Sequence, residues 1–256
     1  TTLFRSKNNV MNKEIIRVEN LKRNYIVGDE IVHALRGIDF SISEGEFVTI
    51  MGTSGSGKST LLNILGCLDT PSDGEYYLDG ISVRKMGKNE RATLRNRKIG
   101  FIFQSYNLLA KTTAVENVEL PLMYNPDISA KDRHQRAIKA LQDVGLGDRL
   151  NHKSNQMSGG QMQRVAIARA LVNEPVIILA DEATGNLDTR TSFEILSLMQ
   201  RLHSQGRTII FVTHNLEISA FSSRNIVIRD GRIKEDTKNT NIQSAKEFLV
   251  KLPVEN

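Results

Sequence analysis

The chain has 256 residues, with 34 Lys and Arg against 29 Asp and Glu, which gives a formal net charge of +5. With 39% hydrophobic and 25% charged residues, its composition is typical of a globular protein with one sizeable core and excludes a mainly disordered chain. The longest apolar runs, at residues 176–180 and 209–212, are far shorter than the roughly 18 consecutive apolar residues of a membrane-spanning helix. We therefore expect no segment that crosses a bilayer.

The N-terminal residues contain no apolar stretch that leads to a small-residue cleavage site, and Cys67 is the single cysteine. Both features favour the cytoplasm, because they indicate neither a secretory signal nor an internal disulfide. Met11 resembles a native start, so we interpret residues 1–10 as an appended segment or flexible tail and residues 11–256 as one domain. The charge of +5 fits an anionic membrane surface, a phosphorylated ligand or an ordinary solvated surface, and it is weak support for nucleic-acid binding.

Apolar and β-branched stretches alternate with segments of helical period, which is the pattern of an α/β protein. The expected strands are residues 15–18, 47–51, 176–180, 208–213 and 226–228. The pairs Asp79-Gly80 and Asp230-Gly231 each lie between short strand-like runs and predict tight hairpins, because a type I′ turn needs positive φ at both central residues. Some antiparallel sheet is therefore expected beside a parallel core.

Helical spacing predicts one helix over residues 129–144, with Ser129 as its cap, and a second from about residue 191 to 203. From Gln104 to about residue 156 the chain lacks a strong strand pattern. We interpret residues of about 104–160 as an inserted helical subdomain and residues of about 237–256 as a C-terminal tail.

A glycine-rich loop follows the expected strand 47–51 and leads into a helical pattern. The candidate nucleotide-binding residues of this loop and helix start are Gly52, Thr53, Ser54, Gly55, Ser56, Gly57, Lys58, Ser59 and Thr60. The glycines let backbone N–H groups surround an anion, and the helix start adds the positive end of its dipole. Lys58 can then reach the β- and γ-phosphates, while Ser59 offers a hydroxyl to Mg²⁺. An ordinary turn is the alternative, but the strand, the Lys-Ser pair and the helix all favour a phosphate site.

The apolar run 176–180 ends in Asp181 and Glu182, at the carboxyl edge of the expected parallel sheet, where open α/β sheets bind ligands. Because neighbouring residues of a strand point in opposite directions, we expect the two acids to have different roles. Asp181 is assigned to the Mg²⁺ shell and Glu182 to polarising the attacking water as a general base. The alternative is an acidic strand end that caps a helix or faces solvent.

A second candidate anion site precedes a helical stretch of small and aliphatic residues at 165–171. Its residues are Ser158, Gly159, Gly160 and Gln161. Ser158 is well placed as the N-cap, and the glycines leave the helix N-terminus accessible. With these motifs in this order, the sequence from about residue 15 to 236 resembles the ATP-binding subunits of ABC transporters. Met157 stands where the family signature usually begins with Leu.

The resemblance implies roles for four further residues. It makes Gln104 the Q-loop glutamine that contacts Mg²⁺ and water, Asp188 part of the D-loop (residues 185–188), His214 the switch histidine at the γ-phosphate, and Tyr25 the aromatic residue that stacks on adenine. Taken alone, each has an ordinary structural explanation, such as packing for Tyr25. The implied fold is α/β: a P-loop NTPase core with a mixed parallel sheet, an antiparallel β subdomain and an inserted α-helical subdomain.

The resemblance also implies partners. Two copies would close head to tail around two ATP molecules with Mg²⁺, so that Ser158, Gly159 and Gly160 of one copy cover the γ-phosphate held by Lys58 of the other. A separate membrane permease would dock in a groove near residues 104–119 and place the chain on the cytoplasmic face of the cell membrane.

Within the family, the sequence is most similar to ATPases of macrolide-exporter and lipoprotein-release systems, which implies export or lipoprotein release, with a periplasmic or extracytoplasmic adaptor as an optional partner. The alternative is an ATPase module that regulates cell-envelope enzymes through a membrane partner without transport. A nucleic-acid ATPase is disfavoured, because it would normally need long coiled-coil insertions or tandem modules, and no nucleic-acid partner is expected.

Overall fold

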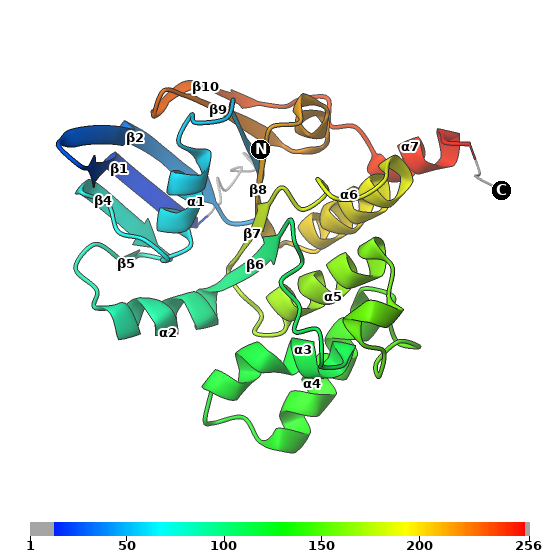
Figure 1. Ribbon diagram of the computed structural model, residues 1–256. Coiled ribbons are helices and arrows are strands. Elements are labelled where there is room, and N and C mark those ends of the chain that lie inside the picture. The colour runs from blue at the N-terminus through cyan, green and yellow to red at the C-terminus, as the bar shows by residue number, and fades with distance from the viewer. Residues whose placement is uncertain (1–12, 254–256) are drawn as a thin grey trace, which may run out of the picture.

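The computed structural model describes residues 13–253, so the expected tail 1–10 lies outside the described residues. A six-stranded sheet in the order β10-β9-β3-β8-β7-β6 forms the centre of the molecule (Figure 1). Its strands are β3 (Phe47–Met51), β6 (Ile99–Phe103), β7 (Ile177–Asp181), β8 (Thr208–Thr213), β9 (Arg224–Arg229) and β10 (Arg232–Lys238). All neighbours are parallel except the hairpin of β9 and β10.

A second, four-stranded antiparallel sheet has the order β2-β1-β4-β5 and lies beside the first (Figure 1). Its strands are β1 (Glu14–Val27), β2 (Glu30–Ser43), β4 (Asp73–Leu78) and β5 (Ile81–Ser82). Both expected hairpins are confirmed. Their central residues all have positive φ, with 50° at Asp79, 77° at Gly80, 51° at Asp230 and 70° at Gly231, as a type I′ turn requires.

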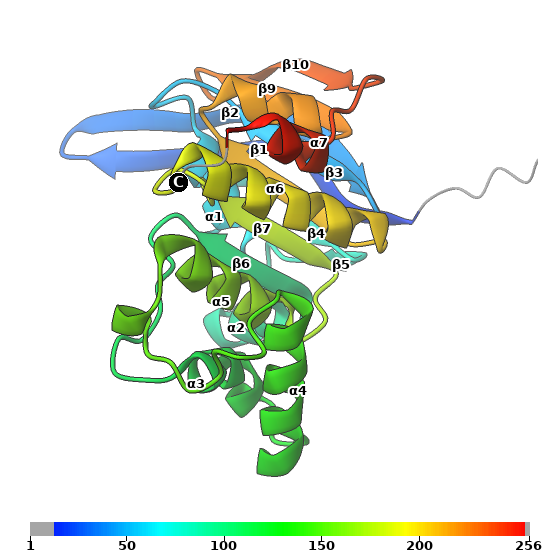
Figure 2. The same cartoon turned by 90° about the vertical axis from the view of Figure 1, so that its right-hand side faces the viewer.

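The helices gather on the side of the large sheet that faces away from the antiparallel sheet, except α1 and α2 (Figures 1 and 2). The α-helices are α1 (Lys58–Leu65), α2 (Lys88–Lys98), α3 (Ala114–Glu119), α4 (Ala130–Asp143), α5 (Gly159–Leu171), α6 (Thr189–Ser204) and α7 (Ala245–Lys251). Short 3-10 helices are η1 (Leu120–Tyr124), η2 (Ser154–Gln156) and η3 (Leu216–Phe221). Ser129 caps α4 by accepting a hydrogen bond from the Asp132 backbone N–H at 3.1 Å, as its sequence predicts.

Two hydrophobic clusters cover the two faces of the large sheet. Phe47 and Phe211 belong to the cluster shared with α3, α4, α5 and α6, whereas their neighbours Val48 and Val212 belong to the cluster shared with α1 and the antiparallel sheet. Strands that are buried on both faces read as continuous apolar runs. This burial holds the carboxyl ends of β3, β7 and β8 in fixed positions next to one another.

Cys67 follows α1 and belongs to the second cluster, with 2% of its surface exposed. Burial raises the pKa of its thiol to about 11. The residue is therefore a small buried apolar group, as expected from a cysteine without metal-ligand neighbours in the sequence.

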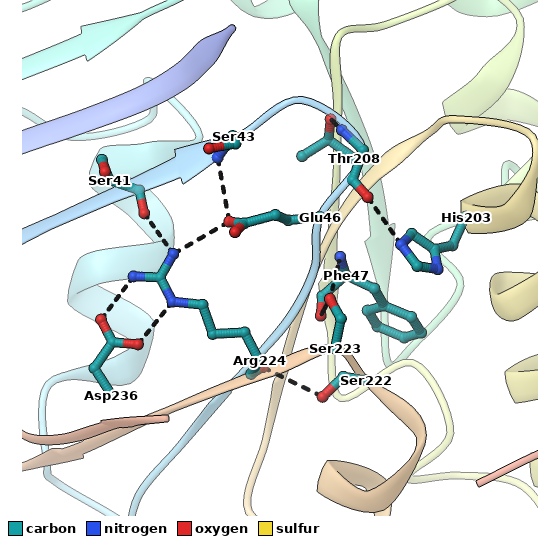
Figure 3. A network of polar contacts seen from close by, with 11 residues as sticks. Ser41, Ser43, Glu46, Phe47, His203, Thr208, Ser222, Ser223, Arg224 and Asp236 are labelled. Atoms are coloured by element: carbon teal, nitrogen blue, oxygen red, sulfur yellow. Dashed lines mark hydrogen bonds and ion pairs between the residues drawn. The ribbon is translucent and has the colours of Figure 1, made fainter. Parts of the chain in front are cut away.

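Arg224, the first residue of β9, forms hydrogen bonds with three other segments of the chain, as Figure 3 shows. Its guanidinium donates two hydrogen bonds to the Asp236 carboxylate, at 2.7 and 2.6 Å, and one each to the Ser41 carbonyl (2.8 Å) and the Glu46 carboxylate (3.1 Å). The hydrogen bonds to Asp236 and Glu46 raise the pKa of Arg224. Such paired contacts fix geometry as well as charge, so β9 is aligned with β10, β2 and the start of β3.

The last described segment, residues 224–253, packs on the core. β10 extends to Lys238, and α7 lies along α6 (Figure 2). Phe248 of α7 stacks on Phe193 at 5.5 Å between ring centroids and meets Phe221 edge to face at 5.4 Å. Among the described residues, no helix has the length and apolar character needed to cross a bilayer.

Candidate active site

The loop between β3 and α1, here called the P-loop (residues 52–59), leaves no room for a side chain at two of its glycines. A Cβ at Gly52 would lie 2.2 Å from the Ile228 carbonyl oxygen, and one at Gly57 would lie 2.6 Å from the Ala34 carbonyl oxygen. Gly57 has a φ of 104° and precedes α1 without a side-chain cap, and the first turn of α1 contains no acidic residue. The backbone N–H groups at this helix start are therefore free of local acceptors and suit an anion.

The Lys58 side chain lies against the backbone of the P-loop. Its ammonium group donates to the Gly52 carbonyl at 2.7 Å and to the Thr53 carbonyl at 2.8 Å, and the residue is 9% exposed. Burial lowers the pKa of Lys58, while the charges of Glu182 and Asp181 act in the opposite direction. The predicted phosphate lysine and the two predicted acids thus share one electrostatic environment.

The remaining residues of the P-loop and of the start of α1 differ in exposure. Thr53, Ser54, Gly55 and Ser59 are exposed and Thr60 is half-buried. The buried Ser56 hydroxyl has no hydrogen-bond partner among residues 13–253. Because buried polar atoms normally have a partner, this hydroxyl fits a loop that is built to receive a polar ligand.

Asp181 and Glu182 lie at the carboxyl end of β7, as the sequence predicts. Burial raises the pKa of Asp181, and the neighbouring Glu182 charge raises it further, while Lys58 opposes the shift. β7 ends at Asp181, however, and Glu182 has a left-handed φ of 44°. The alternation of side-chain directions along a strand therefore does not apply to Glu182. The direction of its side chain is set by this backbone conformation and by the hydrogen bond from its N–H to the Val212 carbonyl at 2.8 Å.

His214 follows β8 and lies beside Glu182. The distance between His214 Nδ1 and Glu182 Oε1 is 2.7 Å, and the histidine side chain is 66% exposed. A cavity of about 300 Å³ is lined by this pair and by other residues that include Phe193 and Phe221. The structure thus brings together Lys58, Asp181, Glu182 and His214 from three neighbouring strand ends.

Gln104 directly follows β6 but turns toward the D-loop. Its Nε2 donates to Asn186 Oδ1 at 3.2 Å, and Asn186 Nδ2 donates to the Gln104 carbonyl at 3.2 Å. Asp188 in the same loop is the N-cap of α6, where it accepts hydrogen bonds from the Thr191 N–H at 2.8 Å and the Thr191 hydroxyl at 2.6 Å. These hydrogen bonds lower the pKa of Asp188.

The segment Ser158 to Gln161 forms a capping box at the start of α5. The Ser158 hydroxyl accepts from the Gln161 N–H at 3.3 Å, and the Gln161 side chain accepts from the Ser158 N–H at 3.0 Å. Cβ atoms at Gly159 and Gly160 would lie 2.9 Å from the Tyr106 hydroxyl and 2.5 Å from a Thr191 methyl. Within residues 13–253, no hydrogen bond joins this segment to the P-loop.

Tyr25 lies on β1, opposite Val32 of β2. Its hydroxyl donates to Asp69 at 3.0 Å, and the Arg23 guanidinium covers one face of its ring at 4.5 Å from the centroid. These two contacts fix the orientation of the Tyr25 ring beside Asp69 and Arg23.

Sequence reasoning missed the buried Gln163 of α5. Its side-chain amide donates to the Ala183 carbonyl at 2.7 Å and lies 3.4 Å from the Phe103 carbonyl. It thus ties the helix that begins with Ser158 to the ends of β6 and β7. Gln163 lies among polar neighbours just before the aliphatic stretch 165–171, so no sequence signal distinguished it from Gln161 and Arg164.

Comparison with known proteins gives an independent result. The family model described as ABC transporter matches residues 35–185. An uncharacterised ABC transporter ATP-binding protein of Thermotoga maritima is 56% identical over 222 residues, which cover 87% of this chain and 94% of that protein. The macrolide export ATP-binding/permease protein MacB of Brucella melitensis is 50% identical over 235 residues, which cover 92% of this chain but 36% of MacB.

A solved structure supports the same conclusion. The ABC transporter ATP-binding protein MJ0796 of Methanocaldococcus jannaschii is 48% identical over 228 residues, covering 88% of this chain and 97% of that protein. Its dimeric structure in a post-hydrolysis state, bound to ADP and Pi, superposes with a TM-score of 0.80 over 88% of this chain and 98% of that chain, at 46% identity. The chain therefore belongs to the ABC transporter family and has the fold of its ATP-hydrolysing cassettes.

Proposed function

We propose that the chain binds ATP at the P-loop and hydrolyses it with Glu182 as the general base. The observation that carries this proposal is the Glu182 carboxylate, positioned beside His214 at 2.7 Å and within the electrostatic influence of Lys58. The N–H groups at residues 52–60 surround the phosphates, and Lys58 exchanges the loop carbonyls for the β- and γ-phosphate oxygens. Tyr25 stacks on adenine with the ring face that Arg23 does not cover.

The chemical step is an in-line displacement. The oxygen of a water molecule attacks the γ-phosphorus while the bond to the β–γ bridging oxygen breaks, and Glu182 accepts the proton of that water. His214 keeps the carboxylate of Glu182 oriented before nucleotide binds, and donates its N–H to the γ-phosphate once ATP is bound. ADP and inorganic phosphate are the products.

The donor set fits Mg²⁺. Burial and the neighbouring Glu182 leave the charged form of Asp181 poorly stabilised, as its raised pKa indicates, so a cation there is favourable. The described residues contain no cluster of three or more His, Cys, Asp or Glu side chains that could hold a metal, so phosphate oxygens and water have to complete the coordination. Ser59, Asp181 and Gln104 would hold the ion, whose charge would neutralise the phosphate oxygens.

We also propose that the site is completed by a second copy of the chain. Ser158, Gly159, Gly160 and Gln161 make no hydrogen bond with their own P-loop, and they lie at a helix N-terminus, which suits a γ-phosphate held by the partner. Asp188 lies at the same interface. The similar MJ0796 cassette forms a dimer in the solved structure, which supports this arrangement.

The membrane partner is proposed to be a separate permease. A groove of about 650 Å³ lies between the large sheet and the helical region, and its lining includes Phe103, Asn107, Leu120 and Tyr124. A permease helix of mixed apolar and polar character would fit it, and the proposed location of the chain is the cytoplasmic face of the cell membrane. Similarity to MacB favours export, with lipoprotein release and a periplasmic or extracytoplasmic adaptor as related possibilities. Control of cell-envelope enzymes is the second candidate, since the same ATPase motor serves both.

The proposal is tested by purifying the chain and its membrane partner together and measuring phosphate release. ATP turnover that requires Mg²⁺ and changes when the permease is present supports the coupled motor. Absence of Mg²⁺-dependent phosphate release from the purified complex would overturn it. A cell-wall hydrolase among the co-purified proteins would favour the regulatory role over export.

A further inference from the structure

In the part of the chain that the structure describes, the Gln104 side chain has one hydrogen-bond partner, Asn186. The two residues exchange two hydrogen bonds of 3.2 Å, one between their side chains and one from Asn186 to the Gln104 backbone carbonyl. They are 82 positions apart in sequence and belong to the loops that follow β6 and β7. Hydrogen bonds of this length at a partly exposed position are weak, so they can be exchanged for other partners.

Gly185 provides a separate indication that this position is built for the Gln104 amide. A Cβ at Gly185 would lie 2.7 Å from Gln104 Nε2 and 3.3 Å from Gln104 Cδ. Any larger residue at position 185 would push the amide away from Asn186. The resting position of Gln104 therefore depends on both D-loop residues.

The backbone that follows Gln104 is fixed by a residue of α5. Arg169 of α5 donates to the Tyr106 carbonyl at 2.8 Å and to the Asn107 carbonyl at 2.6 Å. Tyr106 and Asn107 have φ values of 59° and 51°, a left-handed conformation that non-glycine residues adopt only with support from their surroundings. With the following backbone clamped in this way, the Gln104 side chain is the part of the loop that can change partner at low cost.

We propose that Asn186 is a positioning residue that holds Gln104 against the D-loop until Mg²⁺ and nucleotide enter, when Gln104 exchanges the Asn186 amide for the metal site. This inference rests on the proposed function, in which Gln104 approaches Mg²⁺. The hydrogen bond that Gln104 Nε2 donates to Asn186 competes with that approach, because it keeps the side chain turned toward the D-loop, whereas the second hydrogen bond involves the Gln104 backbone carbonyl alone. Asn186 therefore weakens the contribution of Mg²⁺ to nucleotide binding and links that contribution to the position of the D-loop.

The test is a double-mutant cycle of Asn186→Ala and Gln104→Ala. Calorimetry measures the affinity of monomeric protein for adenylyl imidodiphosphate, a non-hydrolysable ATP analogue, with Mg²⁺ and with EDTA. The ratio of the two affinities isolates the Mg²⁺ contribution. We expect Asn186→Ala to raise this ratio by about 3- to 10-fold, the equivalent of one net hydrogen bond, and Gln104→Ala to lower it. In the Gln104→Ala background, Asn186→Ala should have no further effect.

The outcomes separate this inference from the proposed function. If Gln104→Ala lowers the ratio but Asn186→Ala leaves it unchanged, or if Asn186→Ala still raises it without Gln104, the positioning role of Asn186 is wrong while the Mg²⁺ role of Gln104 stands. If Gln104→Ala itself has no effect, the proposed metal role of Gln104 fails. Asn89→Ala, an exposed asparagine on α2, is the matched control and should leave the ratio unchanged.

A second measurement needs neither metal nor nucleotide. The side-chain amide protons of Gln104, identified by their loss in Gln104→Ala, are observed by NMR in the free protein. They should exchange with water faster in Asn186→Ala than in the wild type. Equal exchange rates would show that the pair does not form in solution and would overturn the inference.

Discussion

Glu182 occupies a backbone position that most residue types avoid. Its φ of 44° directly after β7 is left-handed, and its N–H is bonded to the Val212 carbonyl at 2.8 Å. Such strain persists where the surrounding structure supports it and is concentrated at functional sites. In Glu182 this left-handed conformation directs the carboxylate toward His214, a direction that differs from the one a regular strand residue at this position would have.

Glu182→Gln tests the role of this carboxylate. The amide keeps the shape of the side chain but accepts no proton, so turnover should fall by about 10²- to 10⁴-fold while ATP binding is retained. The variant should also elute as an ATP-dependent dimer in size-exclusion chromatography. Glu217→Gln, at another acid that lines the same cavity, is the control and should keep its activity. Wild-type turnover in Glu182→Gln would remove Glu182 from the mechanism.

Lys58→Ala tests the phosphate site. Its ammonium group is buried over the loop carbonyls at 2.7 and 2.8 Å, ready to exchange them for phosphate oxygens. Deleting a charged hydrogen-bonding group should weaken ATP binding by about 10- to 100-fold, measured by calorimetry. Lys139→Ala, on the exposed side of α4, should bind ATP as the wild type does. Unchanged affinity in Lys58→Ala would contradict the P-loop assignment.

The residue motifs were predictable because each is contiguous. The phosphate loop, the acids after β7 and the Ser158 segment are short stretches whose chemistry is visible in the sequence. The partners of individual side chains were not visible. Asn186 meets Gln104 across 82 positions, and the left-handed position of Glu182 depends on its contact with β8, so neither follows from local pattern.

At the scale of elements, the turn between β4 and β5 combines a backbone requirement with a charge cluster. Asp79 has a φ of 50°, and its carboxylate forms ion pairs with Lys98 at 2.8 Å and with Lys13. The hydrogen bonds from Lys13 and Lys98 lower the pKa of Asp79. The turn therefore connects the antiparallel sheet to the end of α2.

Asp79→Asn removes the charge and keeps a residue that tolerates the left-handed turn. Because the folded-state pKa is lowered, the carboxylate stabilises the protein above its unfolded pKa of about 4, and this stability is lost as pH falls through the folded value. We expect a loss of about 1–2 kcal/mol at pH 7, reduced by solvent around the exposed lysines. The difference between wild type and variant, measured by urea unfolding, should shrink below about pH 4. A difference that is constant with pH would rule out the ion pairs as its cause.

The strands that were predicted correctly are those buried on both faces. β3 and β8 occupy the expected residues 47–51 and 208–213. β1 continues far beyond the expected residues 15–18. The prediction ended too early because register shifts after Val18 interrupt the alternation of apolar and polar residues, and the paired strand β2 was missed for the same reason. α2 was missed because Leu94 is its single buried residue, which leaves no apolar stripe. Elements with few buried residues or with irregular strand pairing have little periodicity of apolar residues in their sequence, so they are hard to predict.

At the scale of the whole molecule, Ser158→Arg tests the proposed two-copy site. Arginine at the start of α5 would place a bulky cation in the interface, so the Glu182→Gln protein carrying it should stay monomeric with ATP while each copy still binds nucleotide. Light scattering measures the mass. Loss of the N-cap lowers the stability of the fold by about 1 kcal/mol. Ser158→Ala removes the cap without adding a cation, so it separates this loss of stability from the effect of the arginine on dimerisation. ATP-dependent dimers in the Ser158→Arg protein would contradict the arrangement.

The buried Cys67 has a practical consequence for such measurements. With a pKa of about 11, roughly one thiol in ten thousand is ionised at pH 7, and thiolate is the form that reacts with alkylating reagents. The native chain should therefore remain unlabelled in its folded state. A cysteine introduced at any exposed position can carry a fluorophore or spin label without removal of Cys67, so distances between two copies can be followed through a full ATP cycle in otherwise unmodified protein.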